Sequence, residues 1–310
     1  MTTRRLRVIV ALVAGSVFLS GCSGSDSPQR DVSAGPIIVA TSAIVADFAG
    51  RIAGDAAVIR TLIPNGFDSH TYDPKPSELA LLGDADLVVL ADANLNAAIT
   101  GLVKLSGDPS RMLDLNAAAL RDDEFVYREP GNAASANPHT WTSPVLAARW
   151  VGPLTERIID LLPVHESTIR DNANALSAEL AALDEEIGEA LRDVPEDRRK
   201  LVVYHDAWEY FGREYGLEVV GALQAVSFAE PSAAELARMV EQIREEGVRV
   251  FFGSEVFPSD VLEALEAESG ARYVPDLADD RLPGDPGDPQ HTYIALMRAN
   301  LGLLVGGLTA

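Results

Sequence analysis

The sequence predicts an α/β protein with two lobes, each with a mostly parallel sheet flanked by helices, and one long helix that joins them. Three observations lead to this fold class. Short apolar runs with β-branched residues alternate with helical stretches from residue 36; from residue 143 to about residue 192 the spacing is helical only; the alternation resumes at residue 200. Alternating strands and helices are typical of parallel βαβ units rather than of a sandwich.

The first lobe is predicted over residues 36–162. Its strand signals are short apolar runs, each followed by apolar residues at helical spacing. We expect strands at 36–42 (PIIVATS), 56–64 (AAVIRTLIP) and 86–92 (DLVVLAD), and helices at 43–54, 76–85 and 95–105. The lobe is expected to end with residues 143–162 as one helix with an internal proline.

Residues 163–195 are predicted to form the linking helix, because apolar residues recur there at helical spacing over some thirty positions. A helix of that length spans ~45 Å, the scale of a whole domain, and we take as a hypothesis that it restricts the lobes to small tilts. The second lobe, residues 196–310, repeats the alternation. Its strands are expected at 200–206, 217–224, 248–256 and 271–277, and its helices at 207–216, 232–247, 258–270 and 292–308.

The N-terminus has the features of an export signal. Three arginines precede the apolar run VIVALVAGSVFL, and the segment ends in Leu-Ser-Gly before Cys22, the only cysteine. This junction resembles the lipobox of bacterial lipoproteins, which implies removal of residues 1–21 and acylation of Cys22; the alternative is an ordinary signal peptide with an incidental cysteine. Residues 22–35, rich in Ser, Gly, Asp and Pro, are expected to be a flexible tether. The chain would then be extracytoplasmic and anchored to the cell membrane by lipid.

Composition argues against several classes of function. Loss of residues 1–21 removes three basic residues and no acidic one, so the net charge changes from −22 to −25. Such a surface repels nucleic acid, and we expect no nucleic-acid partner. No apolar run after the signal approaches the ~20 residues of a membrane-spanning helix. A single cysteine committed to lipid leaves no pair for a disulfide.

Four of the five histidines lie at junctions between predicted strands and helices. His70 follows the second strand, His139 lies in the turn NPHTWTSP, His205 closes a strand, and His291 precedes the last helix. In open α/β sheets, ligands gather beyond the carboxyl ends of the strands. Two of these histidines fall in each lobe, so a single metal site in the cleft between the lobes would satisfy all four. Four imidazole nitrogens, or three and an oxygen, suit tetrahedral Zn²⁺. His165, at the start of the long helix, is expected to have no role in the site.

Four separated segments resemble the solute-binding lipoproteins of bacterial zinc and manganese ABC importers, the cluster with a rigid linking helix. The segments are GFDSHTYDPKPSELALLGDADLVV, NPHTWTSP, VVYHDAWEYFGREYGL and HTYIALMRANL, and they cover both lobes in that family's order. The resemblance implies metal capture and delivery to a cognate ABC permease and its ATPase, by a protein that is not an enzyme and is expected to be a monomer.

The resemblance also implies a ligand set. His70, His139 and His205 take the first three ligand positions. The fourth is usually aspartate in this family; His291 occupies the corresponding place here, so His291, Asp285 or Asp288 is expected to complete the set. Glu255, at a predicted strand end, is either a hydrogen-bond partner of a ligand histidine or a plain strand-end carboxylate. The family's long histidine-rich loop is absent.

The metal is expected to be Zn²⁺, because imidazole suits zinc whereas Mn²⁺ prefers carboxylate and water oxygens. Manganese is the alternative. Two other functions stay open at this point: a metal-binding surface adhesin without a permease, active in cell adhesion, and a zinc hydrolase with Glu255 as general base. Against a hydrolase, a fourth protein ligand would close the open position that a catalytic zinc needs.

Overall fold

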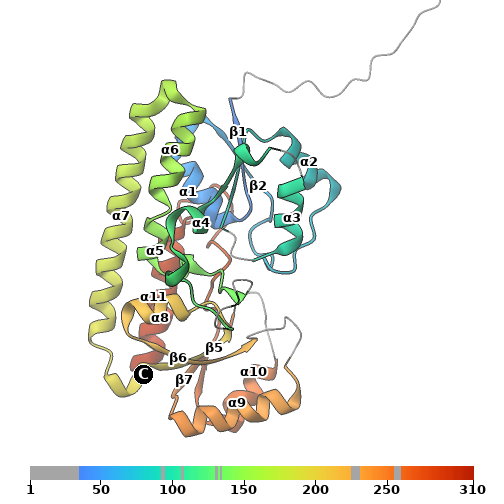
Figure 1. Ribbon diagram of the computed structural model, residues 1–310. Coiled ribbons are helices and arrows are strands. Elements are labelled where there is room, and N and C mark those ends of the chain that lie inside the picture. The colour runs from blue at the N-terminus through green and yellow to red at the C-terminus, as the bar shows by residue number, and fades with distance from the viewer. Residues whose placement is uncertain are drawn as a thin grey trace, which may run out of the picture. The chain divides into compact units, whose positions relative to one another are not determined.

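The computed structural model describes residues 35–91, 95–105, 108–129, 132, 135–224, 231–254 and 260–310. The described chain holds two four-stranded parallel sheets, in the orders β2-β1-β3-β4 and β6-β5-β7-β8 (Figure 1). The strands are β1 (Ile37–Ala40), β2 (Val58–Thr61), β3 (Leu87–Leu90), β4 (Met112–Asp114), β5 (Lys200–His205), β6 (Glu218–Gln224), β7 (Val250–Phe252) and β8 (Arg272–Val274). The predicted two-lobed α/β class is confirmed, and both lobes use the same strand order.

Most of the helices lie where the sequence predicts them. Those of the first lobe are α1 (Ala43–Ala53), α2 (Pro76–Asp84), α3 (Ala97–Leu105), α4 (Leu115–Ala119), α5 (Pro144–Ala148) and α6 (Val151–Leu161). Then come α7 (Glu166–Arg192), α8 (Glu209–Tyr215), α9 (Ala233–Glu246), α10 (Asp260–Ser269) and α11 (Tyr293–Thr309). Short 3₁₀ turns are η2 (Gly54–Ala56), η3 (Pro109–Arg111), η4 (Asp122–Glu124), η6 (Thr140–Thr142), η7 (Pro163–His165) and η8 (Glu196–Arg198).

Two expectations for the first lobe are wrong. The sequence reading missed β4, a three-residue edge strand too short for a pattern to register. The single helix expected over 143–162 is two helices, α5 and α6, which meet at Arg149 and Trp150. Pro153 is the physical reason, since a proline lacks the N–H that a continuous helix would bond to Arg149; it is tolerated in the first turn of α6.

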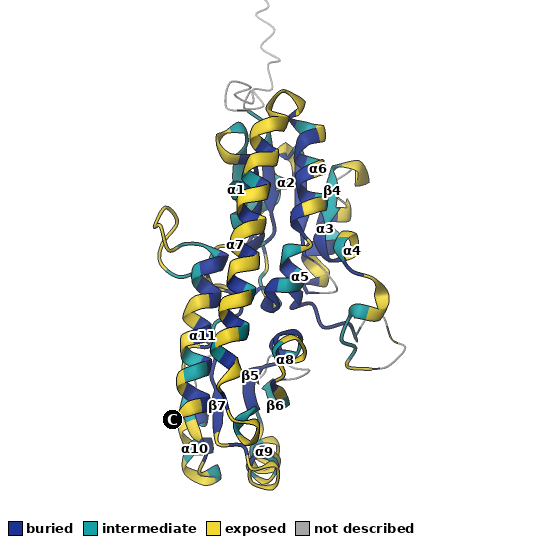
Figure 2. Ribbon diagram, turned by 90° about the vertical axis from the view of Figure 1, so that its left-hand side faces the viewer, coloured by how far each residue is buried: buried dark blue, intermediate teal, exposed yellow. Residues whose placement is uncertain are grey.

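Helix α7 packs against helices of both lobes: α1, α5 and α6 in the first, α8 and α11 in the second. Its buried side chains recur every three or four residues and form one stripe, while its outer face is exposed (Figure 2). The stripe comprises Ile169, Ala173, Leu176, Leu180, Leu183, Ile187 and Leu191. The largest apolar cluster runs along this stripe and includes core residues of both lobes, such as Phe48 and Phe211. The predicted linking helix therefore shares one hydrophobic core with the two lobes.

The other face of each sheet has a core of its own. In the first lobe Val39 and Val88 pack against residues of α2 and α3, and in the second Val202 and Phe251 pack against α9 and α10. Within the described residues, none of the helices combines the length and the apolarity needed to cross a bilayer.

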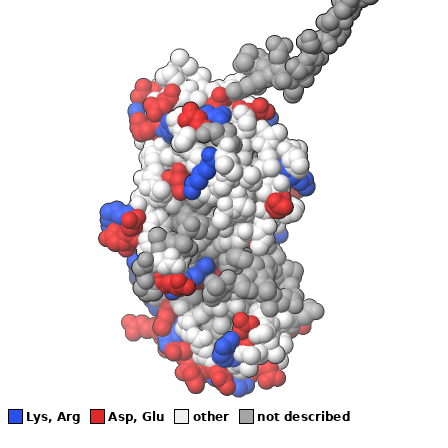
Figure 3. Space-filling model, turned by 45° about the vertical axis from the view of Figure 1, so that its right-hand side comes forward, with Lys and Arg blue, Asp and Glu red and all other residues white. Residues whose placement is uncertain are grey.

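Charged side chains gather on the outer helices. Figure 3 shows acidic groups at several places on this face, among them the end formed by α9 and α10, and Glu241, Glu245 and Glu246 of α9 are exposed. Most of the acidity is thus solvated. By contrast, the buried acidic residues in the described chain are Asp206, Asp279 and Asp280. Burial of a carboxylate is costly unless a cation or hydrogen-bond donors compensate it, so these three residues single out one region.

Candidate metal centre

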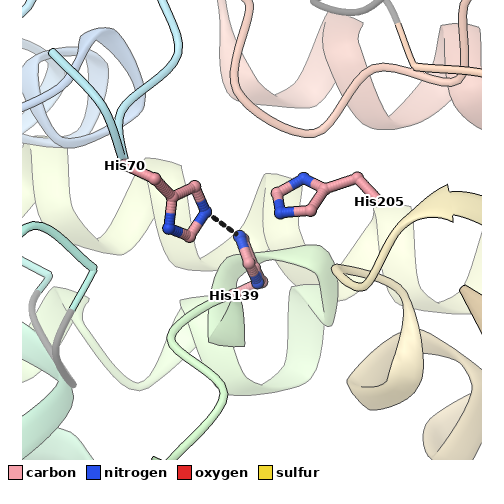
Figure 4. A group of neighbouring side chains, drawn as sticks. All are labelled: His70, His139 and His205. Carbon is pink, nitrogen blue, oxygen red and sulfur yellow. Dashed lines mark hydrogen bonds between the residues drawn. The ribbon is translucent and has the colours of Figure 1, made fainter. Parts of the chain in front are cut away.

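Three histidines from both lobes meet at the carboxyl ends of the strands. His70 lies in the loop after β2, His139 directly precedes η6, and His205 is the last residue of β5. One nitrogen from each ring lies within 4.8 Å of one nitrogen from each other ring. The Nε2 atoms of His70 and His139 are 2.9 Å apart, and the ring of His205 faces both (Figure 4). Such convergence of imidazoles is the geometry that a transition-metal ion requires.

The side chain of Asn137, itself held by two backbone groups, determines the orientation and tautomer of His139. The Asn137 side chain accepts from the backbone N–H of His139 at 3.1 Å and donates through Nδ2 to the carbonyl of Asp206 at 2.8 Å. A backbone N–H can only donate and a backbone carbonyl can only accept, so the amide orientation is fixed and Asn137 Oδ1 is an acceptor. Nδ1 of His139, 2.8 Å from that oxygen, therefore carries the proton. The Nε2 lone pair of the neutral ring is left to face His70.

A carboxylate orients His205. Its Nδ1 lies 2.7 Å from Oδ2 of Asp279, and both side chains are buried. The indole of Trp141 donates to the Asp279 backbone carbonyl at 2.7 Å. A histidine that donates one N–H to a carboxylate presents the opposite nitrogen to a metal as a stronger base.

The loop that carries His70 is held at its base. Asp68 accepts from the backbone N–H of His70 at 2.8 Å and from the Thr71 hydroxyl at 2.6 Å. Asn96 of the segment before α3 donates to the carbonyl of Ser69 at 2.9 Å. The His70 ring itself hydrogen-bonds the Leu95 backbone. The ring is therefore placed before any ligand arrives.

The pKa values of the three histidines differ in direction between the lobes. Burial, followed by the charges of His205 and Arg128, lowers the pKa of His70 to about 3. Burial, followed by His205 and His70, likewise lowers the pKa of His139 well below its usual range. Burial also opposes protonation of His205, but the carboxylate of Asp279 outweighs it and raises the pKa to about 9. At neutral pH without metal, the first lobe thus supplies two neutral imidazoles, and the second supplies a protonated His205 paired with the carboxylate of Asp279.

His291 does not join the other three histidines, contrary to the sequence-based expectation. It lies in the loop before α11, with Nδ1 3.2 Å from the carbonyls of Pro283 and Gly284. Asp285 and Asp288, the other candidates for the fourth ligand, are exposed, and the Asp288 carboxylate accepts from the Asp285 backbone N–H. Hydrogen bonds within this loop therefore engage the residues that were expected to reach the cleft.

Two neighbouring carboxylates lie next to the histidine cluster. Asp279 and Asp280 follow β8 in the loop at the carboxyl end of the second sheet. Oδ2 of Asp280 lies 3.3 Å from the backbone N–H of Ser69, next to His70. Burial, followed by Asp279, raises the pKa of Asp280 to about 7. The sequence signal for this pair is the two adjacent aspartates in LADDRL at the end of the last predicted strand.

Other predicted residues have simpler outcomes. His165 is exposed at the start of α7, as an ordinary surface residue would be. Glu255 and Cys22 lie outside the described residues, so their predicted roles stay predictions.

Two α/β lobes with parallel sheets, one linking helix and a histidine cluster between the carboxyl ends of the sheets define a solute-binding protein for metal ions. The chain belongs to the family described as "Zinc-uptake complex component A periplasmic" (ZnuA), whose model matches residues 38–307. This membership confirms the predicted class of substrate-binding proteins of metal ABC importers, which are not enzymes.

Individual relatives differ in the metal that they are named for. The chain is 27% identical over 304 residues to the iron-binding protein YfeA of Yersinia pestis, covering 98% of this chain and 96% of that one. It is 24% identical to the manganese-binding lipoprotein MntA of Halalkalibacterium halodurans, covering 97% and 96%. The structure of the periplasmic zinc-binding protein TroA of Treponema pallidum matches with a TM-score of 0.80 at 23% identity, covering 88% of this chain and 99% of that one. The last likeness concerns the fold alone.

Proposed function

We propose that this protein captures a divalent transition metal outside the cytoplasm, Zn²⁺ in the first place, and delivers it to an ABC permease and its ATPase. One observation carries the proposal: His70, His139 and His205 turn ring nitrogens toward a common point. His139 and His205 are held there by Asn137 and Asp279 on the other side of each ring. Two nitrogen lone pairs 2.9 Å apart repel unless a proton or a cation lies between them. Zn²⁺ meets both requirements of the site, nitrogen ligands and a charge that offsets buried carboxylates.

The fourth ligand in this proposal is a carboxylate oxygen of Asp280 rather than His291. Asp280 is buried, and its hydrogen bond to the Ser69 backbone puts it beside the His70 loop. Asp279 is less suited, since its Oδ2 already receives the N–H of His205. Substitution of Asp280→Asn should weaken metal binding, and His291→Ala should leave it unchanged. The reverse pattern in a chelator competition would restore His291 to the site.

Zinc is favoured over manganese by the donor set, three imidazoles and one carboxylate, because Mn²⁺ prefers oxygen ligands. The experiment is a competition between Zn²⁺ and Mn²⁺ for the metal-free protein, followed by calorimetry and by metal analysis of the recovered protein. Tight zinc binding that manganese cannot displace would support the proposal. Displacement of zinc by equimolar manganese would make the chain a manganese carrier.

Delivery to a permease, the lipid anchor and the monomeric state are parts of the same proposal. Relatives are named as lipoproteins of metal ABC transporters, and the lipobox-like junction before Cys22 supports acylation of that residue. A Cys22→Ala variant should leave the membrane fraction, and loss of the gene should impair growth in zinc-depleted medium. Normal growth of the deletion strain in that medium would argue for the adhesin alternative, in which import plays no part.

A further inference from the structure

Two hydrogen bonds cross between the lobes at the residues that orient the site histidines. Asn137, which holds His139, donates to the Asp206 carbonyl next to His205. Trp141 donates to the carbonyl of Asp279, which holds His205. We propose that these two bonds form a cross-brace that makes metal retention depend on closure of the lobes. The inference rests on the proposed function and adds Asn137 and Trp141 as positioning residues.

The Asn137 half of the cross-brace begins from a segment fixed to the first lobe. Thr140 donates to Oδ1 of Asn116 in α4 at 2.5 Å, and Asn116 donates to the carbonyl of Pro138 at 3.3 Å. The Asn137 amide, fully buried, reaches from this segment to Asp206 in the second lobe. Separation of the lobes therefore removes support from the residue that orients the His139 ring.

The Trp141 half supports the residue that orients the second lobe's histidine. Trp141 is buried beside the ring of His139, and the hydroxyl of Tyr293 donates to its carbonyl at 2.6 Å. Its indole N–H holds the backbone of Asp279, whose carboxylate takes the N–H of His205. Each lobe thus steadies the residue that orients the other lobe's histidine.

This arrangement couples the position of the lobes to ligand geometry. A metal ion that needs both histidines in their present orientation stabilises the closed lobes, and by linkage closed lobes bind the ion more tightly. When the lobes part, the rings lose the contacts that fix their rotation before the nitrogens have moved far. Metal release then needs only a small displacement, which suits lobes that share one core along α7.

A matched control lies elsewhere in the same interface. Asn65 makes two hydrogen bonds to Leu282 across the lobes: its Nδ2 donates to the carbonyl at 2.9 Å, and its Oδ1 accepts from the N–H at 2.8 Å. Neither of these bonds contacts a site histidine or a residue that orients one. Asn65→Ala therefore removes interlobe bonding of the same kind without touching the cross-brace.

The test measures the rate of Zn²⁺ release into excess chelator for Asn137→Asp, Trp141→Phe and Asn65→Ala, with the visible spectrum of bound Co²⁺ as a probe of ligand geometry. Aspartate keeps the acceptor for His139 and loses the donor to Asp206; phenylalanine keeps the buried ring and loses the indole N–H. Both should release zinc faster, by up to the ~10–100-fold that loss of a partner of a metal ligand causes, and alter the cobalt spectrum, because each loses the interlobe bond that holds such a partner in place. Asn65→Ala should lower the thermal midpoint, accelerate release less than either cross-brace variant does, and leave the cobalt spectrum unchanged.

A readout without metal separates positioning from binding. Nitrogen-15 NMR of metal-free wild type should show His139 with its proton on Nδ1; Asn137→Asp should keep that tautomer and Asn137→Ala should lose it. Release at the wild-type rate from both cross-brace variants, or equal acceleration by Asn65→Ala, would overturn the inference. A wild-type chain that holds neither zinc nor cobalt would instead overturn the proposed function, and retention by the cross-brace with it.

Discussion

The two lobes are built on the same strand order and contribute to the site in opposite ways. The first lobe supplies His70 and His139, whose pKa values are lowered, with an amide and backbone groups as partners. The second supplies His205, whose pKa is raised, with the buried acids Asp206, Asp279 and Asp280 around it. One fold used twice thus places neutral donors on one side of the cleft and the charge that balances a cation on the other.

The largest effect should follow removal of a ligand from the first lobe. His139→Ala should lower zinc affinity by more than the ~100-fold that loss of a partner of a ligand produces, because it removes a nitrogen donor itself. Isothermal titration with a competing chelator measures this. His165→Ala, an exposed histidine, is the control and should bind as wild type does. Equal affinities for both variants would remove His139 from the site.

A somewhat smaller effect is expected at the second lobe's partner residue. Asp279→Asn keeps an acceptor for His205 and removes a negative charge from the site, so zinc affinity should fall about 10–100-fold. The comparison between the lobes would be broken if Asp279→Asn bound zinc as tightly as wild type does, since the carboxylate would then contribute nothing that an amide cannot.

The raised pKa of His205 predicts a pH dependence in the metal-free protein. A histidine titrates near 6.5 in the unfolded chain and at about 9 here, so its protonation stabilises the folded state fully below pH ~6.5 and not at all above pH ~9. Thermal midpoints with chelator present should therefore show wild type above His205→Gln at pH 6, with a difference that shrinks as the pH rises to 9. A difference that grows over this range would contradict the assigned charge state.

A modest effect is expected from the ion pair between Arg128 and Asp206. The Nε–Oδ2 distance is 2.7 Å, but the arginine side chain is 30% exposed, so solvent screens the pair. Arg128→Ala should lower the free energy of unfolding by about 1 kcal/mol or less. Chemical denaturation checks this, with Arg121→Ala, a more exposed arginine of the same lobe, as the comparison.

The smallest effect concerns the lobes themselves. Because α7 and both lobes share one apolar core, zinc should change the radius of gyration in solution scattering by less than the reproducibility of the measurement. A large hinge rotation on metal removal would show that the core along α7 does not restrain the lobes.

The fold could be predicted to a large extent, since strand and helix periodicities are local signals. Residues 36–42 and 200–206 are recognisable as strands from their β-branched runs, and the stripe of α7 from its spacing. The features that could not be predicted are either very short or depend on where a single residue interrupts a regular pattern. The edge strand β4 has three residues, and the division at Arg149 and Trp150 depends on where one proline interrupts the helical hydrogen bonds.

For the site, the useful signal in the sequence is position at a junction between predicted strands and helices. It identifies His70, His139 and His205, which the structure brings together. The same signal misleads at His291, because proximity to a helix start says nothing about whether a loop folds back on itself. Asp279, Asp280 and Asn137 were passed over because their importance lies in what they touch across the cleft.

The sequence by itself determined the two α/β lobes, the long helix and three histidines at junctions between elements, since each depends on neighbours along the chain. Only the tertiary structure decided which polar side chains from distant segments meet. Burial then excludes water from those groups, and a hydrogen bond to Asn137 or Asp279 settles which nitrogen of each histidine faces the cleft.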